Sequence, residues 1–201
     1  MSEERRPNSN DQRFIQLKPI AINMPSSDKS LTVDFGGITK DNVEQLRMIN
    51  TSSFPVQYND AFYKDVVDRH DEDLCKFAYW NGFVVGAICA RIEPIPEADL
   101  EDSATPGRKR LYIMTLAVLA AYRGRGVGRQ MVKSVLDHVA ENIDTAKYAD
   151  VDEVTLHVQT SNDGAQKFYM EGFGFAKGKM VENYYRRIDP PHCYILSKKL
   201  R

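Results

Sequence analysis

Apolar and polar positions along the 201 residues divide the chain into β-rich and helical segments. The longest apolar run covers residues 111–121 and is flanked by charge, which is typical of a central strand covered on both faces. A glycine-rich turn follows at residues 123–128, and apolar residues then recur at helical spacing from Val127 to Val139. This pattern predicts a strand, a glycine-rich turn and a helix, in that order.

Turn and capping residues place the other elements around this centre. Asn81-Gly82 joins two β-rich runs and is a strong signal for a two-residue hairpin, while Pro55 separates two short helices. In chain order, the predicted elements are a strand at 31–35, a helix from Thr39 or Asp41 to about Thr51, a helix from Asn59 or Asp60, strands at 74–80 and 83–92, the central strand and its helix, a second buried strand at 154–159, a helix at 163–171 capped by Asn162 or Ser161, and strands at 175–181 and 193–196. Helices mixed with hairpins and with two adjoining parallel central strands predict an α/β (α+β) fold with a mixed sheet.

Composition and charge predict that these elements form one globular domain, which carries two polar segments. A chain with 42% hydrophobic and 27% charged residues fits one globular domain, expected at residues 31–201. Residues 1–30 are polar and interrupted by prolines, so we expect a flexible N-terminal arm. Residues 93–107 are acidic and carry three prolines, which predicts a long loop whose charges serve solvation. A net charge of −1 provides no general attraction for nucleic acid or acidic membranes.

The cysteines and the N-terminal residues bear on the cellular compartment. Cys75, Cys89 and Cys193 are odd in number and far apart, and no CxxC pair suggests a zinc or redox site, so we expect reduced, buried thiols and no metal. The first residues are charged without an apolar core, so no secretory signal is predicted, and no apolar stretch is long enough to span a bilayer. These features predict a cytoplasmic or nuclear protein.

The glycine-rich turn predicts an anion-binding site. The first N–H groups of a helix have no partner within the helix, and the helix dipole places partial positive charge beside them. Glycines keep side chains away from these amides, and the strings GxxxxGK[ST] and GxGxxG are absent, so neither a P-loop nor a dinucleotide site is predicted. The spacing RxxGxG instead places Arg123, Gly126 and Gly128 around a phosphate or pyrophosphate. The alternative is a plain strand-to-helix connection with solvated arginines.

Two further segments carry candidate chemistry. His157 alternates in phase with Thr155 and Gln159 and so shares the more polar face of its strand. An unperturbed imidazole titrates near ~6.5, which suits a general base at neutral pH, and a core histidine with a satisfied partner is the alternative. Residues 54–60 carry Phe, Val and Tyr in a predicted loop, which indicates either packing beneath the loop or the wall of a binding site.

The whole series resembles the GNAT superfamily of acetyltransferases, whose acetyl-CoA signature RxxGxG is filled by Arg123, Gly126 and Gly128. It is more similar still to N-terminal acetyltransferases of the NatE type, over roughly residues 31–200. The strings that carry this second resemblance are FPVQYND at 54–60, FYKDV at 62–66, RLYIMTL at 110–116, LHVQTSN at 156–162 and NYYRRID at 183–189. The resemblance implies a single GNAT domain with the acetyl donor in a V-shaped gap between two splayed parallel strands.

The resemblance also implies roles for individual residues. Tyr112 and His157 match the pair that removes a proton from the substrate amine through an ordered water, whereas the sequence alone leaves both open as ordinary buried residues. The implied contacts of coenzyme A are Leu116, Val118, Arg123, Gly124, Arg125, Gly126, Val127, Gly128, Arg129, Asn162 and Tyr169. The implied contacts of the substrate N-terminus are Phe54, Pro55, Val56, Tyr58, Met114, Tyr184, Tyr185, Arg186, Arg187 and Ile188. One departure is Gly172, an extra residue near the helix end beside the coenzyme.

The implied activity is transfer of acetyl from acetyl-CoA, without a metal, to the α-amine of proteins that retain the initiator methionine before a bulky residue. The implied partners are protein N-termini, the NatA auxiliary and catalytic subunits and the ribosome, with no nucleic acid or membrane. Two alternatives stay open: a protein lysine acetyltransferase, and a non-catalytic subunit of a ribosome-associated NatA/NatE assembly. The presence of both Tyr112 and His157 favours an enzyme.

Overall fold

The computed structural model describes residues 30–69, 71–95 and 108–200, which form one seven-stranded sheet flanked by helices. The strand order is β1-β2-β3-β4-β5-β7-β6, and only the β4–β5 pair is parallel among the described strands. The elements are β1 Asp34–Gly37, α1 Val43–Ser53, α2 Asp60–Arg69, β2 Cys75–Trp80, β3 Phe83–Pro94, β4 Lys109–Val118, the 3-10 turn η2 Ala120–Tyr122, α3 Val127–Glu141, β5 Val151–Gln159, α4 Asp163–Phe173, β6 Ala176–Val181 and β7 Cys193–Lys199. A mixed sheet with a parallel central pair confirms the predicted fold class.

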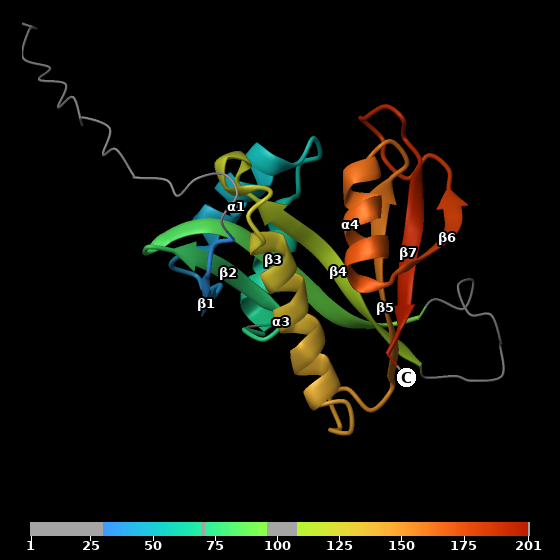
Figure 1. Cartoon of the computed structure of the whole chain (residues 1–201), viewed down its shortest axis with the longest axis horizontal. Helices are drawn as coiled ribbons and strands as arrows, with labels where there is room; N and C mark the ends of the chain where they lie inside the picture. Colours follow the sequence, from blue (N-terminus) through green and yellow to red (C-terminus); the bar gives the residue numbers. More distant parts are fainter. Residues whose placement is uncertain (1–29, 70, 96–107, 201) are drawn as a thin grey trace, which may run out of the picture.

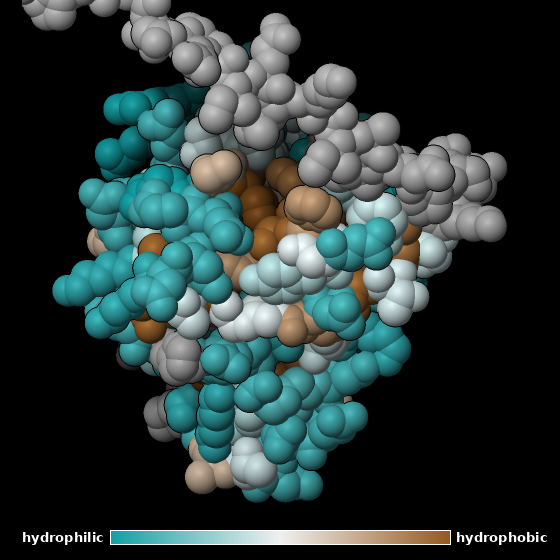
Figure 2. Space-filling model, turned by 90° about the vertical axis from the view of Figure 1, so that its left-hand side faces the viewer, coloured by the Kyte–Doolittle hydropathy of each residue, from teal (hydrophilic) through white to brown (hydrophobic). Residues whose placement is uncertain are grey.

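Helices cover both faces of the sheet and bury two clusters of side chains. On one face, α3 packs Met131 and Val135 against the sheet, and α4 adds Tyr169 to the same cluster. On the other face, α1 and α2 pack Leu46 and Val66 against the first half of the sheet. Figure 1 shows α3 and α4 in front of the strands and α1 behind them. Figure 2 shows one side of the molecule, whose surface is mostly hydrophilic, with hydrophobic residues gathered in a hollow.

The start of α1 differs from the prediction. Asn42 is its N-cap, in place of Thr39 or Asp41. The Asn42 side chain accepts the Thr39 N–H at 2.7 Å and donates to the Gly37 carbonyl at 3.0 Å. It therefore closes the turn between β1 and α1, a contact that depends on where β1 ends and that local capping preference does not reveal.

The end of α1 and the start of α2 follow from one proline and one asparagine. Pro55 disfavours helical dihedrals at Phe54, which is extended with φ −117° and ψ 143°, so α1 runs through Ser53 instead of ending near Thr51. Asn59 accepts the Phe62 N–H at 3.1 Å, which confirms it as a cap for α2. The chain between the two helices is thereby held as a short, ordered loop.

Residues 30–33 lie beside the glycine-rich turn, and β1 begins only after them, which corrects the strand predicted at residues 31–35. The Leu31 N–H donates to the Arg125 carbonyl at 3.0 Å. The Gln130 side chain donates to the Leu31 carbonyl at 2.5 Å and accepts the Val33 N–H at 3.3 Å. A side-chain amide thus takes the hydrogen bonds that a neighbouring strand would supply. Of the predicted N-terminal arm, only residue 30 is described.

β3 continues through Glu93 and Pro94, which the sequence placed in an acidic loop. Glu93 pairs with Arg110 of β4, and its carboxylate binds two arginines, so this charge is used inside the structure and not for solvation. Residues 96–107 of the predicted loop lie outside the described residues.

Two element ends near the central gap also differ from prediction. β4 ends at Val118 because the chain turns into η2, whereas the apolar run continues to Ala121. α4 runs to Phe173, past the predicted end at Glu171, because Gly174 is the residue that adopts the left-handed conformation, with φ 73°. The extra residue Gly172 is therefore part of the last helical turn.

Candidate active site

The parallel strands β4 and β5 separate in the middle of the sheet. Their backbones pair only from Lys109 to Tyr112 on β4 and from Val151 to Thr155 on β5. Both strands continue beyond these residues, and Figure 1 shows them diverging. The predicted V-shaped gap is therefore present, and it holds two adjoining cavities of about 450 Å³ and 400 Å³.

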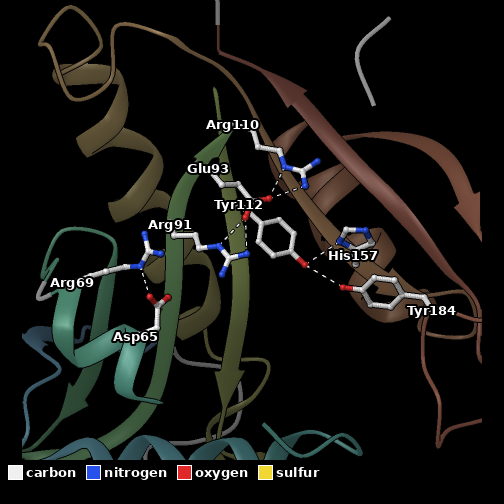
Figure 3. Close-up of polar contacts among 8 residues, drawn as sticks. All are labelled: Asp65, Arg69, Arg91, Glu93, Arg110, Tyr112, His157 and Tyr184. Carbon is white, nitrogen blue, oxygen red and sulfur yellow. Dashed lines mark hydrogen bonds and ion pairs between the residues drawn. The ribbon is translucent and has the colours of Figure 1, made fainter. Parts of the chain in front are cut away.

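Tyr112 and His157 meet at the point where the two strands separate. The Tyr112 hydroxyl lies 3.0 Å from His157 Nδ1 and 3.5 Å from the Tyr184 hydroxyl. The Tyr184 ring stacks on the imidazole, with ring centres 4.5 Å apart and planes 9° apart. Figure 3 shows the three side chains converging from β4, β5 and the loop after β6. The two residues that the resemblance implied as catalytic form a hydrogen-bonded pair.

Burial keeps the phenols of this site protonated at neutral pH. Burial raises the pKa of Tyr112 well above its usual value, and the neighbouring Tyr184 and Glu93 raise it further. Burial likewise raises the pKa of Tyr58, to about 12. Tyr112 is therefore a neutral hydroxyl that can donate or accept a hydrogen bond, and His157 is the member of the pair suited to accept a proton.

The larger cavity, which we call the acceptor cavity, is enclosed by two aromatic loops and by Tyr112 and His157. The implied substrate contacts that line it are Phe54, Pro55, Val56, Tyr58, Met114, Tyr184, Tyr185 and Ile188. Arg186 and Arg187 are exposed and do not line it. These two arginines follow the tyrosines in sequence, but the loop directs them to the surface.

The first aromatic loop both packs on the core and forms a cavity wall. The ring of Tyr58 lies 5.9 Å from that of Phe54, edge to face, and 4.6 Å from that of Phe62. Phe62 in turn meets Tyr63, which is buried at 4% exposure. Phe54 and Tyr58 also line the acceptor cavity. The loop therefore both packs on the core and forms a cavity wall, the two alternatives that its sequence indicated.

The second aromatic loop, residues 182–192, is anchored to the end of β5. Gln159 Nε2 donates to the Pro190 carbonyl at 2.9 Å. Within the loop, the Tyr185 N–H donates to the Pro191 carbonyl at 2.8 Å. These bonds place the tyrosine pair opposite the first aromatic loop, across the acceptor cavity.

The smaller cavity, which we call the donor cavity, lies over the glycine-rich turn. The implied coenzyme contacts that line it are Leu116, Val118, Arg123, Gly124, Gly126, Val127, Gly128, Arg129 and Tyr169. Asn162 instead lines the acceptor cavity, and its side chain accepts the Ala165 N–H at 3.0 Å as the cap of α4. Arg125 lines neither cavity, and its carbonyl receives the Leu31 N–H. Leu116 and Tyr169 line both cavities, which shows that the two spaces adjoin.

The turn leaves the first amides of α3 open to an anion. Gly126 is the N-cap, with φ 80°, and it has no side chain to occupy those amides. Arg123 Nε donates to the Val118 carbonyl at 2.9 Å, and Arg129 Nη1 donates to the Gly172 carbonyl at 3.3 Å. The extra residue Gly172 thus touches the turn: a Cβ there would lie 3.3 Å from Arg129 Nη2.

Several residues that line the two cavities, or that bind a lining residue, were not predicted from the sequence. Tyr122 and Phe168 line the donor cavity, and Arg91 lines the acceptor cavity beside its partner Glu93. Phe168 could have been found, because it shares a helical face with Tyr169. Arg91 and Glu93 carry a weaker signal, as charged residues alternating within an apolar strand. Tyr122 lies in a 3-10 turn that no periodicity marks.

The donor cavity fits coenzyme A in its chemistry. Bare amides at the start of α3 with arginines on either side suit a pyrophosphate, and the apolar walls between Leu116 and Phe168 suit an extended thiol-bearing arm.

Within the described ranges, no group of three or more His, Cys, Asp and Glu residues is arranged to hold a metal ion. None of the described helices is long and apolar enough to cross a membrane.

This fold and this pair of cavities define a coenzyme A-dependent acyltransferase. The sequence profile of the acetyltransferase (GNAT) family matches residues 43–175, and the chain belongs to this family.

Similar proteins narrow the family relationship. The chain is 41% identical over 169 residues to N-alpha-acetyltransferase 50 of Danio rerio, which covers 84% of this chain and 89% of that protein. It is 39% identical over 170 residues to the protein san of Drosophila melanogaster, covering 85% and 82% of the two chains. Arabidopsis thaliana Naa50, solved in complex with the bisubstrate analogue CoA-Ac-MVNAL, has 39% identity and a TM-score of 0.69, covering 84% of this chain and 99% of that chain.

Proposed function

We propose that the protein is an N-alpha-acetyltransferase that transfers acetyl from acetyl-CoA to the α-amine of a polypeptide, with both substrates bound together. The observation that supports this most directly is the 3.0 Å contact between Tyr112 and His157 inside a gap that joins a donor and an acceptor cavity. A pair in this position serves an amine that arrives from the acceptor side. The similarity to N-alpha-acetyltransferase 50 supports the same activity.

The donor side would be held mainly by backbone. The amides that open α3 would bind the pyrophosphate, and Arg123 and Arg129, both fixed by carbonyl contacts, would add charge beside it. The exposed edge of β4 near Leu116 and Val118 would align the pantetheine arm along the gap. The thioester supplies an activated acetyl group whose carbonyl is open to attack by a neutral amine.

The acceptor side would prepare that amine. Neutral His157 accepts the proton of the incoming ammonium through a water held by the Tyr112 hydroxyl, which leaves the nitrogen lone pair free. Because the Tyr112 phenol stays protonated, it orients the relay and does not compete for the proton. The two aromatic loops would clamp the peptide backbone and exclude water from the reacting atoms.

The mildness of this base favours an α-amine over a lysine. From reference pKa values near ~7.8 and ~10.4, roughly 10–20% of an α-amine is neutral at pH 7, against well under ~0.1% of a lysine side chain. A histidine with a neutral phenol therefore suffices for the first acceptor, whereas lysine acetylation would need a stronger base. We rank lysine acetylation as a side activity.

We propose that the preferred substrates retain an initiator methionine before a bulky second residue. The acceptor cavity offers apolar walls from Phe54, Val56, Met114 and Ile188 for a long unbranched side chain. The peptide part of the analogue bound to Arabidopsis Naa50 also begins with methionine. Protein N-termini are the partners that this assignment requires.

We further propose that the protein acts in the cytoplasm and also in the nucleus, in association with NatA subunits at the ribosome. Three buried free thiols suit a reducing compartment. Fluorescence imaging of the full chain and co-sedimentation with ribosomes test this proposal. Secretion, or a full-chain population that never co-sediments with NatA subunits or ribosomes, would contradict it.

A peptide panel tests the activity itself. Purified protein and acetyl-CoA are incubated with a Met-Leu peptide, and with the same peptide carrying a blocked N-terminus and one internal lysine. Mass spectrometry is expected to show acetylation of the first peptide and at least ~100-fold slower acetylation of the second, following the difference in neutral amine. Equal or faster lysine acetylation would overturn the proposal, and no turnover on either peptide would favour a non-catalytic subunit.

A further inference from the structure

Four side chains form a square on the cleft-facing side of the sheet next to the catalytic pair. Arg91 and Glu93 belong to β3, and Arg110 and Tyr112 belong to β4. Arg91 lies directly opposite Tyr112, and Glu93 directly opposite Arg110. Because directly paired residues share one face of a sheet, all four side chains lie on the face of Tyr112. Figure 3 shows the cluster from this face.

A bulge in β4 creates this arrangement. The pairing Cys89 with Thr115 is followed by Ala90 with Ile113, so the register skips Met114. Without the skipped residue, Arg91 would lie opposite Ile113, on the other face from Tyr112. The extra residue Met114 itself lines the acceptor cavity. One insertion therefore places both a cavity wall and a charged network at the reaction centre.

The Glu93 carboxylate joins the two arginines. Its Oε2 accepts bonds from Arg91 Nε at 2.7 Å and Nη2 at 2.6 Å. Its Oε1 accepts bonds from Arg110 Nε at 2.8 Å and Nη2 at 2.7 Å. The side chains of Glu93 and Arg110 are only 17% and 8% exposed. Charge-assisted bonds of this length between planar groups hold their partners more firmly than surface ion pairs do, and the bonds between Glu93 and Arg110 are the better shielded from water, since the Arg91 side chain is 35% exposed.

The two arginines in turn hold the ring of Tyr112. The guanidinium carbon of Arg91 lies 5.7 Å from the ring centre, and that of Arg110 lies 5.5 Å from it. Both distances are within the range of attraction between a cation and an aromatic ring. The Tyr112 hydroxyl then extends from this frame to His157.

We propose that Glu93 is a positioning residue for acetyl transfer: it locks Arg91 and Arg110 against Tyr112 and so fixes the phenol at the distance from His157 that the proton relay needs. This inference rests on the proposed role of the Tyr112–His157 pair. Neither arginine needs to touch substrate for Glu93 to act in this way. Loss of the carboxylate removes the bonds that Glu93 makes to the two cations and lets the ring move.

The network also sets the charge around the pair. Arg91 and Glu93 of β3, Arg110 of β4, His157 of β5 and Tyr184 of the second aromatic loop face Tyr112. Glu153 of β5 lies beside Arg110 in the register and binds Lys199 at 3.1 Å. Because Glu93 contributes one negative charge, its removal makes the charge beside the ring more positive by one unit. The loss of this negative charge disfavours protonation of His157, so the Glu93→Gln variant should titrate at lower pH there than the parent protein.

Glu93→Gln tests the proposal, because glutamine keeps the shape and removes the charge. We expect kcat on the Met-Leu peptide to fall about 10- to 100-fold, the order of loss that small misplacement of a reacting group causes. We expect KM for acetyl-CoA to stay unchanged, since the donor cavity contains none of these residues. The acid limb of the kcat/KM profile should move to lower pH by about half a unit.

Asp71→Asn is the matched control. Asp71 is also a partly buried carboxylate, 19% exposed, and its partner Lys147 at 3.0 Å lines neither cavity. This variant loses an ion pair whose carboxylate is about as buried as that of Glu93 but which lies away from both cavities, so kcat and the pH profile should match the parent protein. An equal loss of kcat in both variants would show general destabilisation and overturn the proposal, as would full activity of Glu93→Gln.

A second variant and an NMR titration test the role of Glu93 independently of Glu93→Gln kinetics. If Glu93→Gln does not fold, as judged by circular dichroism, Arg91→Lys provides the second variant. Lysine keeps the positive charge but lacks the planar guanidinium whose two N–H groups bind Glu93, so kcat should still fall. NMR titration of His157 in the full chain needs no substrate, and Glu93→Gln should lower its pKa by about half a unit. An unmoved titration refutes the inference even if the peptide activity is present. A moved titration supports the charge effect even if the acceptor is not an α-amine.

Discussion

The imidazole of His157 lies face to face with the phenol ring of Tyr184, with ring centres 4.5 Å apart and planes 9° apart. The hydroxyl of Tyr184 also reaches to within 3.5 Å of the Tyr112 hydroxyl. Tyr184 therefore contacts both His157 and Tyr112, although the resemblance implied only a grip on the peptide. The loop expected to hold the peptide also forms part of the wall beside the imidazole.

Two mutations can separate the contribution of the Tyr184 ring to kcat/KM from that of its hydroxyl. Tyr184→Phe keeps the stack and should reduce kcat/KM by less than about 5-fold, the range of one neutral hydrogen bond. Tyr184→Ala removes the stack and the cavity wall, and should reduce kcat/KM by about 100-fold. Steady-state kinetics on the Met-Leu peptide measure both. Equal losses in the two variants would assign the effect to the hydroxyl and contradict the importance of the stack.

Tyr112 and His157 should behave as one unit. His157→Ala is expected to lower kcat by about 10²- to 10⁴-fold, the usual range for a general base, and Tyr112→Phe by a smaller factor. Because the hydroxyl acts through the imidazole at 3.0 Å, the double variant should lose little more than His157→Ala alone. Steady-state kinetics of the two single variants and the double variant complete a double-mutant cycle. If the loss of kcat in the double variant equals the product of the two single losses, the two residues have independent roles.

The glycine-rich turn predicts a loss of donor binding from one added methyl group. Gly126→Ala forces a left-handed alanine at φ 80° and places its Cβ 2.8 Å from Ser30 Oγ, so the Ser30 side chain must move aside and the backbone of the turn is strained. We expect KM for acetyl-CoA to rise about 10-fold or more, with a stability loss of about 1–2 kcal/mol from the backbone alone.

Gly82→Ala is the control for that experiment. Gly82 has φ 78°, and a Cβ there meets nothing within 4 Å. The variant should lose similar stability in a thermal melt while keeping the parent KM for acetyl-CoA. If both variants raise that KM equally, the effect comes from general destabilisation and not from the turn.

Buried tyrosines should make the fold sensitive to strong alkali. In the folded chain the pKa of Tyr58 is raised to about 12, and that of Tyr112 is also raised, against about 10 in the unfolded chain. Above about pH 10 the unfolded state loses these protons first, so stability is complete below that pH and falls as pH rises, by up to about 1.4 kcal/mol per pH unit for each phenol. Urea unfolding at pH 8, 10.5 and 11.5 measures the slope. Tyr58→Phe should make it shallower, and an unchanged slope would contradict the assignment.

Local signals in the sequence account for the parts of the structure that depend on few residues. Asn81 and Gly82 adopt φ 48° and 78°, as the hairpin signal predicted, and α3 begins at Val127, within the RxxGxG motif. Asn162 caps α4 through the Ala165 N–H, also as predicted. Each of these features is decided within a few residues, which is the range over which turn and cap preferences act.

The parts that could not be predicted depend on register between distant segments. The pairing of Arg91 with Tyr112 follows from the bulge at Met114, which no composition signal marks. The contact between Glu93 and Arg110 joins residues 17 apart in sequence, across a connection that composition indicated only as a solvated loop. The resemblance therefore named Tyr112 and His157, which the structure places in contact, and the ion-pair network beside them became visible only in the assembled sheet.

The hydrogen bonds from residues 30–33 to the glycine-rich turn set a lower limit on how far the chain can be trimmed. Leu31 donates to the Arg125 carbonyl, and Gln130, one turn into α3, holds the backbone of Leu31 and Val33. A shortened protein that starts at β1 would keep all the described strands and helices, yet the amides proposed to bind the pyrophosphate would lose the hydrogen bonds that residues 30–33 make beside them. Fragment screens against the donor cavity should therefore use a chain that begins before Ser30.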